Sequence, residues 1–94
     1  MPKIEPPVEV AIAAWEWGKY FDPALAEKGI RLDLARYRRP APYTAPVHSK
    51  AAGLYMICTL SRQQAEGRGF DDALMLDWRG QVAEATGANI FFVK

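Results

Sequence analysis

The sequence predicts a small mixed α/β chain, and two observations favour this fold class. Residues 51–66 have the wide apolar face of an amphipathic helix and are followed by glycines. Two segments that precede them, 8–15 and 30–37, have the apolar patterns of strands. The chain has 94 residues, of which half are apolar, so it is globular in composition and large enough for one small domain at most.

The first half of the chain contains two strand-like segments around a short helix. "VEVAIAAW" (8–15) is a nearly continuous apolar run, which suits a strand that is covered on both faces. In "FDPALAEKGI" (21–30), Asp22 is a helix N-cap, Pro23 suits the first helical position and Gly29 is the stop. "IRLDLARY" (30–37) alternates leucines with polar residues, as a half-buried strand does.

A loop and a second helix come next. The stretch before residue 50 is predicted to be a loop, because three prolines within ten residues exclude regular structure there. These are Pro40, Pro42 and Pro46. The helix predicted for 51–66 presents an apolar face and ends at glycines; that face consists of Leu54, Tyr55, Ile57, Cys58 and Leu60, and the glycines are Gly67 and Gly69.

The remainder is predicted to be three strand segments. "DDALMLDW" (71–78) is a strand, "RGQ" makes a turn, and "QVAEA" resumes the sheet. "NIFFVK" (89–94) is a last strand. Because both 8–15 and 89–94 lack a neighbouring strand in the chain, we expect a segment of a longer two-domain protein, with the change of domain near 18–31.

Charge and cysteine content exclude several classes of partner. The net charge is +1, so nothing indicates binding to nucleic acid or to a membrane surface. The basic cluster at residues 36–39 is explained by a solvated strand end. The single cysteine, Cys58, is expected to be a small core residue in a reducing compartment. The N-terminus lacks the apolar core of a signal peptide and no apolar run reaches roughly 18 residues. The expectation is a soluble cytoplasmic protein.

Lys50 is the first candidate for chemistry, because it lies where the proline-rich loop meets the apolar helix. A lysine at a helix start can simply point into water. If it is desolvated instead, its neutral amine can attack a carbonyl and form a Schiff base. Should that carbonyl belong to pyridoxal phosphate, the site also needs an acid near the ring nitrogen, a donor near the phenolic oxygen and a phosphate-binding site.

Two further residues suit such a site. Glu84 lies among small and apolar residues, where an unpaired carboxylate is costly, and a protonated ring nitrogen would pair with it; a surface glutamate is the alternative. Tyr55 is five residues after Lys50 and can reach the same loop, although it can equally be a core aromatic residue. A lone His48 cannot form a metal site, and no metal-ligand spacing accompanies it.

Together, three blocks resemble the fold-type IV, or class IV, pyridoxal-phosphate aminotransferases, and most closely the branched-chain amino-acid aminotransferases. "AIAAWEWGKY" (11–20) is similar to a family strand that leads into an aromatic-x-Trp-Gly motif. "KAAGLY" (50–55) resembles the cofactor-lysine motif and "GQVAEATGANIFFVK" (80–94) the glutamate motif. Glu84 follows Lys50 by 34 positions, as in the family. The resemblance covers essentially the whole chain but only the middle part of a family member.

The resemblance implies a partial D-amino-acid aminotransferase-like fold of the α/β (α+β) class. Residues 1–20 would be the end of the small N-terminal domain, 21–31 the interdomain linker, and 32–94 the first part of the large cofactor-binding domain. Family members are homo-oligomers, dimers or hexamers. The reaction implied converts leucine, isoleucine or valine and 2-oxoglutarate into 2-oxo acids and glutamate.

Roles follow from the resemblance residue by residue. Lys50 would be the catalytic residue, binding the cofactor covalently and moving the substrate's proton, while the helix after it would keep the site dry. The other implied cofactor contacts are Tyr55 at the phenolic oxygen, Glu84 at the ring nitrogen, and Thr86 and Gly87 beside them. Trp17 and Tyr20 would line the substrate pocket.

Departures from the family pattern keep other possibilities open. Leu54 stands where many branched-chain enzymes have Asn, and Ala88 where an acidic residue is common. The family's phosphate-binding residues lie outside this segment. The alternatives are D-amino-acid aminotransferase, (R)-amine transaminase and aminodeoxychorismate lyase. An inactive 94-residue interaction module is another, and we expect this segment alone to lack activity.

Overall fold

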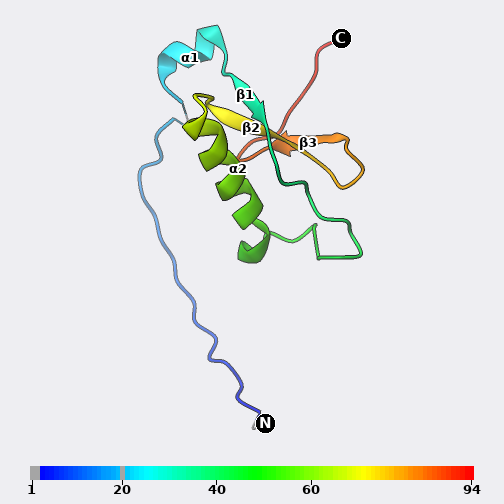
Figure 1. Cartoon of the computed structure of the whole chain (residues 1–94). Coiled ribbons are helices and arrows are strands. Elements are labelled where there is room, and N and C mark those ends of the chain that lie inside the picture. Colours follow the sequence, from blue (N-terminus) through cyan, green and yellow to red (C-terminus); the bar gives the residue numbers. More distant parts are fainter. Residues whose placement is uncertain (1–2, 20) are drawn as a thin grey trace.

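The computed structural model describes residues 3–19 and 21–94, and it has a three-stranded sheet with one main helix beside it (Figure 1). The elements are, in order, α1 (Pro23–Lys28), β1 (Leu32–Leu34), a 3₁₀ turn η1 (Ala52–Leu54), α2 (Met56–Gly67), β2 (Asp72–Leu76) and β3 (Val82–Ala85). The predicted mixed α/β class is confirmed.

The sheet order is β1-β2-β3, and its two pairings have different directions. β1 pairs with β2 in parallel, which requires a crossover, and α2 supplies it. β2 pairs with β3 as an antiparallel hairpin. The small buried core lies where α2 packs against β2; its apolar members are Ala41, Cys58, Ala65, Ala73, Met75 and Ala85. Cys58 is therefore the small core residue that the sequence predicted.

The helix α1 forms for the local reasons that its sequence indicates. The Asp22 side chain accepts a hydrogen bond from the Ala24 amide at 2.9 Å, and Pro23 occupies the first helical position. Gly29 ends the helix with φ of 77°, a left-handed conformation that glycine adopts without a Cβ clash. The predicted N-cap and stop are both confirmed.

The strand β1 forms as predicted but presents the opposite face to the helix. Leu32 and Leu34, the predicted buried residues, are 37% and 59% exposed. Asp33 is turned toward the helix end, where its carboxylate meets the Arg68 guanidinium at 2.8 Å. An ion pair rather than leucine packing therefore joins β1 to the end of α2, and the leucine face of the strand is uncovered in the described chain.

The helix predicted for 51–66 consists of two pieces. The turn η1 is followed at Tyr55 by α2, which ends at Gly67. Its buried side chains are Cys58, Ser61 and Ala65, whereas the predicted apolar face is partly open, with Leu60 being 42% exposed. The prediction of a wide buried apolar face is wrong, because β1 and β2 cover only a narrow strip of small residues on α2.

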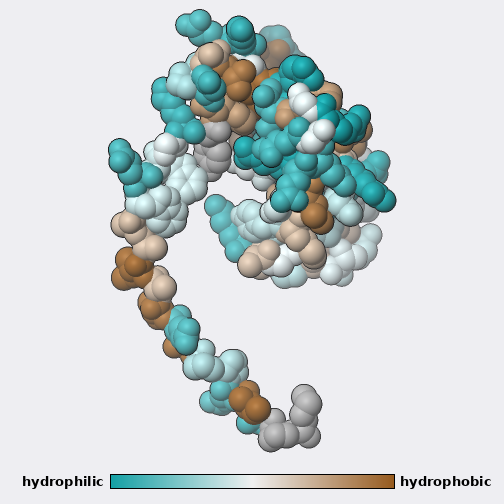
Figure 2. Space-filling model, turned by 60° about the vertical axis from the view of Figure 1, so that its left-hand side comes forward, coloured by the Kyte–Doolittle hydropathy of each residue, from teal (hydrophilic) through white to brown (hydrophobic). Residues whose placement is uncertain are grey.

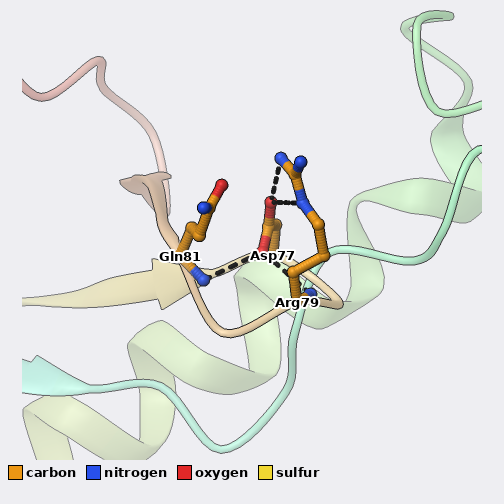
Figure 3. A network of polar contacts seen from close by, with 3 residues as sticks. All are labelled: Asp77, Arg79 and Gln81. Atoms are coloured by element: carbon orange, nitrogen blue, oxygen red, sulfur yellow. Dashed lines mark hydrogen bonds and ion pairs between the residues drawn. The ribbon is translucent and has the colours of Figure 1, made fainter.

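The β2–β3 turn is held by one carboxylate (Figure 3). Asp77 Oδ1 accepts from the backbone amides of Arg79 and Gln81, both at 2.9 Å. Its Oδ2 accepts from Nε and Nη2 of Arg79, at 3.1 and 2.9 Å. The Gln81 amide is the first cause, and the Arg79 contacts further ones, that hold the pKa of Asp77 below its ordinary value. Gly80 has φ of 84°, as the predicted "RGQ" turn requires.

Two predicted strands are not strands in the structure. Residues 8–15 are extended but pair with no described segment, and residues 89–94 form no ladder either. Their apolar side chains are exposed, as Figure 2 shows along the N-terminal segment; Val8, Val10, Ile12, Trp15, Phe91, Phe92 and Val93 are among them. Strand formation needs a partner strand, and the described residues offer none there. Within residues 3–19 and 21–94, no helix is long and apolar enough to cross a membrane.

Candidate functional site

The predicted residues gather around one cavity of about 510 Å³ between the proline-rich loop, the start of α2 and the end of β3. Five of them line it, and these are Lys50, Tyr55, Glu84, Thr86 and Gly87. The other lining residues are Arg39, Val47, His48, Ser49, Leu54, Cys58, Ala88 and Asn89. The cavity has the size typical of small-molecule and cofactor sites, which are about 300–1,000 Å³.

Lys50 and Tyr55 stand at the two ends of η1. The turn is closed by the Tyr55 amide, which donates to the Ala52 carbonyl at 3.1 Å. This single turn brings the amine and the phenol to the same cavity wall. Lys50 itself is exposed, so the described residues alone do not provide the dry environment predicted around its amine, which stays a prediction.

Glu84 projects from β3 and is bound by Arg39. Nη1 of Arg39 lies 2.9 Å from Glu84 Oε1, and the two side chains are 24% and 32% exposed. Arg39 was assigned to a solvated basic cluster by the sequence pattern, and that interpretation is wrong for this residue. No local sequence pattern distinguishes it from its neighbours, because its partner is far away in the chain.

Cys58 lines the same cavity and interacts with both members of this ion pair. Burial raises the pKa of the Cys58 thiol, and the nearby Glu84 charge adds to the increase; Arg39 opposes it through its charge and a hydrogen bond. A raised pKa keeps the thiol protonated, so Cys58 is a neutral part of the cavity wall rather than a nucleophile.

Thr86 and Gly87 form the end of the cavity after β3. The Thr86 hydroxyl donates to Oδ1 of Asp72, a carboxylate that is 2% exposed. Asp72 lies on β2 and also accepts from the Ala73 amide at 2.7 Å. Because its hydroxyl proton is used by Asp72, Thr86 can offer the cavity its remaining lone pairs and its backbone. Asp72 is a supporting residue that the sequence pattern did not reveal.

The two predicted substrate-pocket residues are not brought to this cavity. Trp17 lies on the extended N-terminal segment, where its ring contacts Trp15 with centroids 5.7 Å apart, and it does not line the cavity. Tyr20 lies outside the described residues. Their assignment to a substrate pocket stays a prediction.

The lining residues fit an aldehyde cofactor with a basic ring nitrogen better than they fit a metal ion. The cavity holds an amine, a phenol and a carboxylate, which match a carbonyl, a phenolic oxygen and a ring nitrogen in turn. In residues 3–19 and 21–94, no group of three or more His, Cys, Asp or Glu could hold a metal.

Comparison with known families and sequences gives one consistent result. The model of the family described as amino-transferase class IV matches residues 1–94. A probable branched-chain-amino-acid aminotransferase of Rickettsia felis is 47% identical over 72 residues, which are 77% of this chain and 25% of that protein. The branched-chain-amino-acid aminotransferase of Pseudomonas aeruginosa is 38% identical over 87 residues, 93% of this chain and 28% of that protein.

Two solved structures of aminotransferases are also similar to most of this chain. A branched-chain aminotransferase from Thermoproteus uzoniensis with norvaline matches with a TM-score of 0.68 and 34% identity, covering 79% of this chain and 24% of that one. An aminotransferase from Brucella abortus bound to the cofactor PLP matches with a TM-score of 0.61 and 34% identity. The match covers 76% of this chain and 24% of that one. The chain thus spans about a quarter of the length of these relatives.

Proposed function

The chain belongs to the class IV amino-transferase family, and on that premise we propose that it is the part of a branched-chain amino-acid aminotransferase that carries the catalytic lysine. The observation that carries the proposal is the single cavity that Lys50, Tyr55 and Glu84 share. Three of the four relatives described above are named branched-chain aminotransferases, and these names support this subfamily over the other fold-type IV enzymes.

The proposed cofactor is pyridoxal 5'-phosphate, which the Brucella abortus relative binds. When bound, it supplies an electron-withdrawing ring that stabilises the charge left on a substrate carbon after deprotonation. Lys50 would hold it covalently through Nζ. Tyr55 would donate a hydrogen bond to the phenolic oxygen, and Glu84 would accept one from the protonated ring nitrogen. Thr86 and Gly87 would contact it from the end of β3.

In the reaction, Lys50 Nζ would be released when the substrate amine takes its place on the cofactor, and would then move a proton between the alpha carbon of leucine, isoleucine or valine and the cofactor. Glu84 would stay ionised opposite the ring nitrogen, and Tyr55 would keep the phenolic oxygen in place. The net change transfers the amino group to 2-oxoglutarate, giving a 2-oxo acid and glutamate. Trp17 and Tyr20 would contact the substrate side chain in the complete protein.

The wider assignments belong to the same proposal. Residues 1–20 would end a small N-terminal domain, 21–31 would link the domains, and 32–94 would begin the cofactor-binding domain. The protein would act in the cytoplasm as a homo-oligomer, a dimer or hexamer. The uncovered leucine face of β1 and the unpaired segments 8–15 and 89–94 supply surfaces for the contacts that these assignments need.

The test compares the complete protein with its Lys50→Ala variant, using Lys28→Ala on α1 as the control. Transamination of leucine with 2-oxoglutarate should fall by at least about 10²–10⁴-fold in Lys50→Ala, the usual contribution of a positioned acid–base group. The far-ultraviolet circular dichroism should not change, because an exposed side chain is removed. Near-normal turnover of Lys50→Ala would overturn the proposal. A preference for D-alanine or for a simple amine would instead assign a different fold-type IV activity.

A further inference from the structure

We propose that Arg39 is a positioning residue that fixes the distance between the Lys50 loop and the Glu84 strand across the cavity. The inference rests on the proposed function, because the two groups it positions are the proposed catalytic lysine and the proposed partner of the ring nitrogen. It adds a residue that binds neither substrate nor cofactor but determines how the two sides of the site face each other.

One guanidinium connects both segments. Nη1 of Arg39 contacts Glu84 Oε1 at 2.9 Å, while Nη2 donates to the Val47 carbonyl at 3.1 Å. Val47 is three residues before Lys50 in the loop, and Glu84 lies on β3. The planar fork of arginine can hold two acceptors in fixed directions, which a single ammonium group cannot do.

Arg39 is itself fixed to the sheet. Its backbone amide donates to the Leu76 carbonyl at 2.8 Å, and it forms an isolated parallel bridge with Asp77 at the end of β2. Pro40 follows it and restricts the conformation of both residues. The guanidinium is therefore carried by an anchored backbone rather than by a free loop, so its two contacts can set a distance.

The contact with Arg39 leaves the Glu84 carboxylate able to accept a hydrogen bond from the ring nitrogen. Arg39 meets Oε1 of Glu84, and a carboxylate has a second oxygen that can accept another hydrogen bond. The side chains of Arg39 and Glu84 are both less than a third exposed, at 24% and 32%, so water screens their attraction only in part. Arg36 and Arg38 are exposed, and neither lines the cavity.

The experiment uses the complete protein and three variants: Arg39→Gln, Arg39→Lys, and Arg38→Gln as the matched control that removes the same charge one residue away. Two quantities are measured, the dissociation constant of pyridoxal phosphate by fluorescence and the NMR shift of its isotope-labelled ring nitrogen in the bound state. Circular dichroism and thermal melting confirm folding.

Arg39→Gln should weaken cofactor binding by about tenfold or more, the effect of losing a hydrogen bond to a charged group. It should also move the ring-nitrogen signal toward the unprotonated form, since Glu84 is no longer held opposite it. Arg39→Lys should restore part of both, because it retains the charge but only one contact. Arg38→Gln should match the wild type. A general loss of stability would not move the ring-nitrogen signal.

Arg39→Gln behaving like Arg38→Gln in both measurements, in a protein whose wild type carries the cofactor on Lys50, would overturn the role of Arg39 and leave the proposed function intact. A wild type that binds no pyridoxal phosphate would overturn the proposed function itself. If Arg39→Gln does not fold, the test rests on Arg39→Lys. Wild-type cofactor affinity and a wild-type ring-nitrogen signal in Arg39→Lys would contradict the proposal that Arg39 must contact both Glu84 and the Val47 carbonyl.

Discussion

At Glu84 the structure places a carboxylate where water reaches it only in part, and it provides one cation to balance the charge. Arg39 supplies that cation, and Cys58 in the same cavity stays neutral because burial and the Glu84 charge raise the pKa of its thiol. The local arrangement thus has a negative group, a positive group and a neutral wall. A bound molecule with a protonated ring nitrogen would add a second partner for the carboxylate.

Replacing Glu84 with Gln in the complete protein should therefore lower the kcat for leucine by about a hundredfold. The amide keeps the shape but loses the charge, and a hydrogen bond to a charged group contributes about 1.5–3 kcal/mol. Steady-state kinetics check this, with Glu66→Gln on the exposed side of α2 as the control. A fully active Glu84→Gln enzyme would mean that another acid faces the ring nitrogen.

Individual residues differed in how far the sequence could identify them. Lys50, Tyr55 and Glu84 were found because a motif records their spacing, and the structure brings all three to one cavity. Arg39 was missed because its sequence context, beside Arg36 and Arg38, looks like a solvated cluster. Its partner is 45 positions away in the chain, and no local pattern reports a contact of that range.

At the scale of elements, the β2–β3 turn depends on one side chain. Asp77 accepts hydrogen bonds from the backbone amides of Arg79 and Gln81 and from two side-chain nitrogens of Arg79. Between this turn and Glu84, the β2–β3 pairing has a register shift at Met75 and Leu76. In the pairing, Glu84 lies opposite Met75, which is fully buried. The position of the carboxylate thus depends on this register shift as well as on the turn and on the core residue across from it.

Asp77→Ala should increase amide hydrogen exchange at residues 79 and 81, whereas Asp77→Asn should have a smaller effect because it keeps one acceptor oxygen. The pKa of Asp77 is lowered in the folded state, so its contribution is complete above the unfolded value, near pH 4, and is lost as the pH falls through the folded value. In the wild type, the protection of these amides from exchange, relative to their intrinsic rates at each pH, should fall selectively below pH 4. Equal exchange in wild type and Asp77→Ala at neutral pH would contradict this.

Elements whose causes are local were predicted, and those whose causes are distant were not. The cap at Asp22, the stop at Gly29 and the turn at Gly80 depend on neighbouring residues, and the structure has all three. The strand pattern of 8–15 and 89–94 requires partners, and the alternation in β1 does not tell which face meets the helix. There the Asp33–Arg68 ion pair decides the orientation instead of the leucines.

At the scale of the whole molecule, the chain exposes far more surface than a compact protein of its size. Its accessible surface is 8265 Å², whereas a compact folded chain of this mass exposes about 5,400 Å². Its radius of gyration is 16.9 Å, against about 12 Å for a compact domain of this length. Figure 2 shows part of the cause in the extended N-terminal segment.

This open shape agrees with the span of the alignments, which cover about a quarter of each relative. It also explains the exposure of Lys50, because the described residues leave the cavity partly open to solvent. The proposed dry site around Lys50 therefore requires contacts beyond those that the described residues make.

The measurement that tests the central claim most directly is borohydride reduction of the purified complete protein, followed by peptide mass mapping. Reduction makes the link between an amine and a bound aldehyde permanent, so the modified residue is identified by its mass. The chain offers internal controls in its other lysines, namely Lys3, Lys19, Lys28 and Lys94. We predict a phosphopyridoxyl group on Lys50 and on none of these four. An unmodified Lys50, or modification at another lysine instead, would contradict its assignment as the catalytic residue.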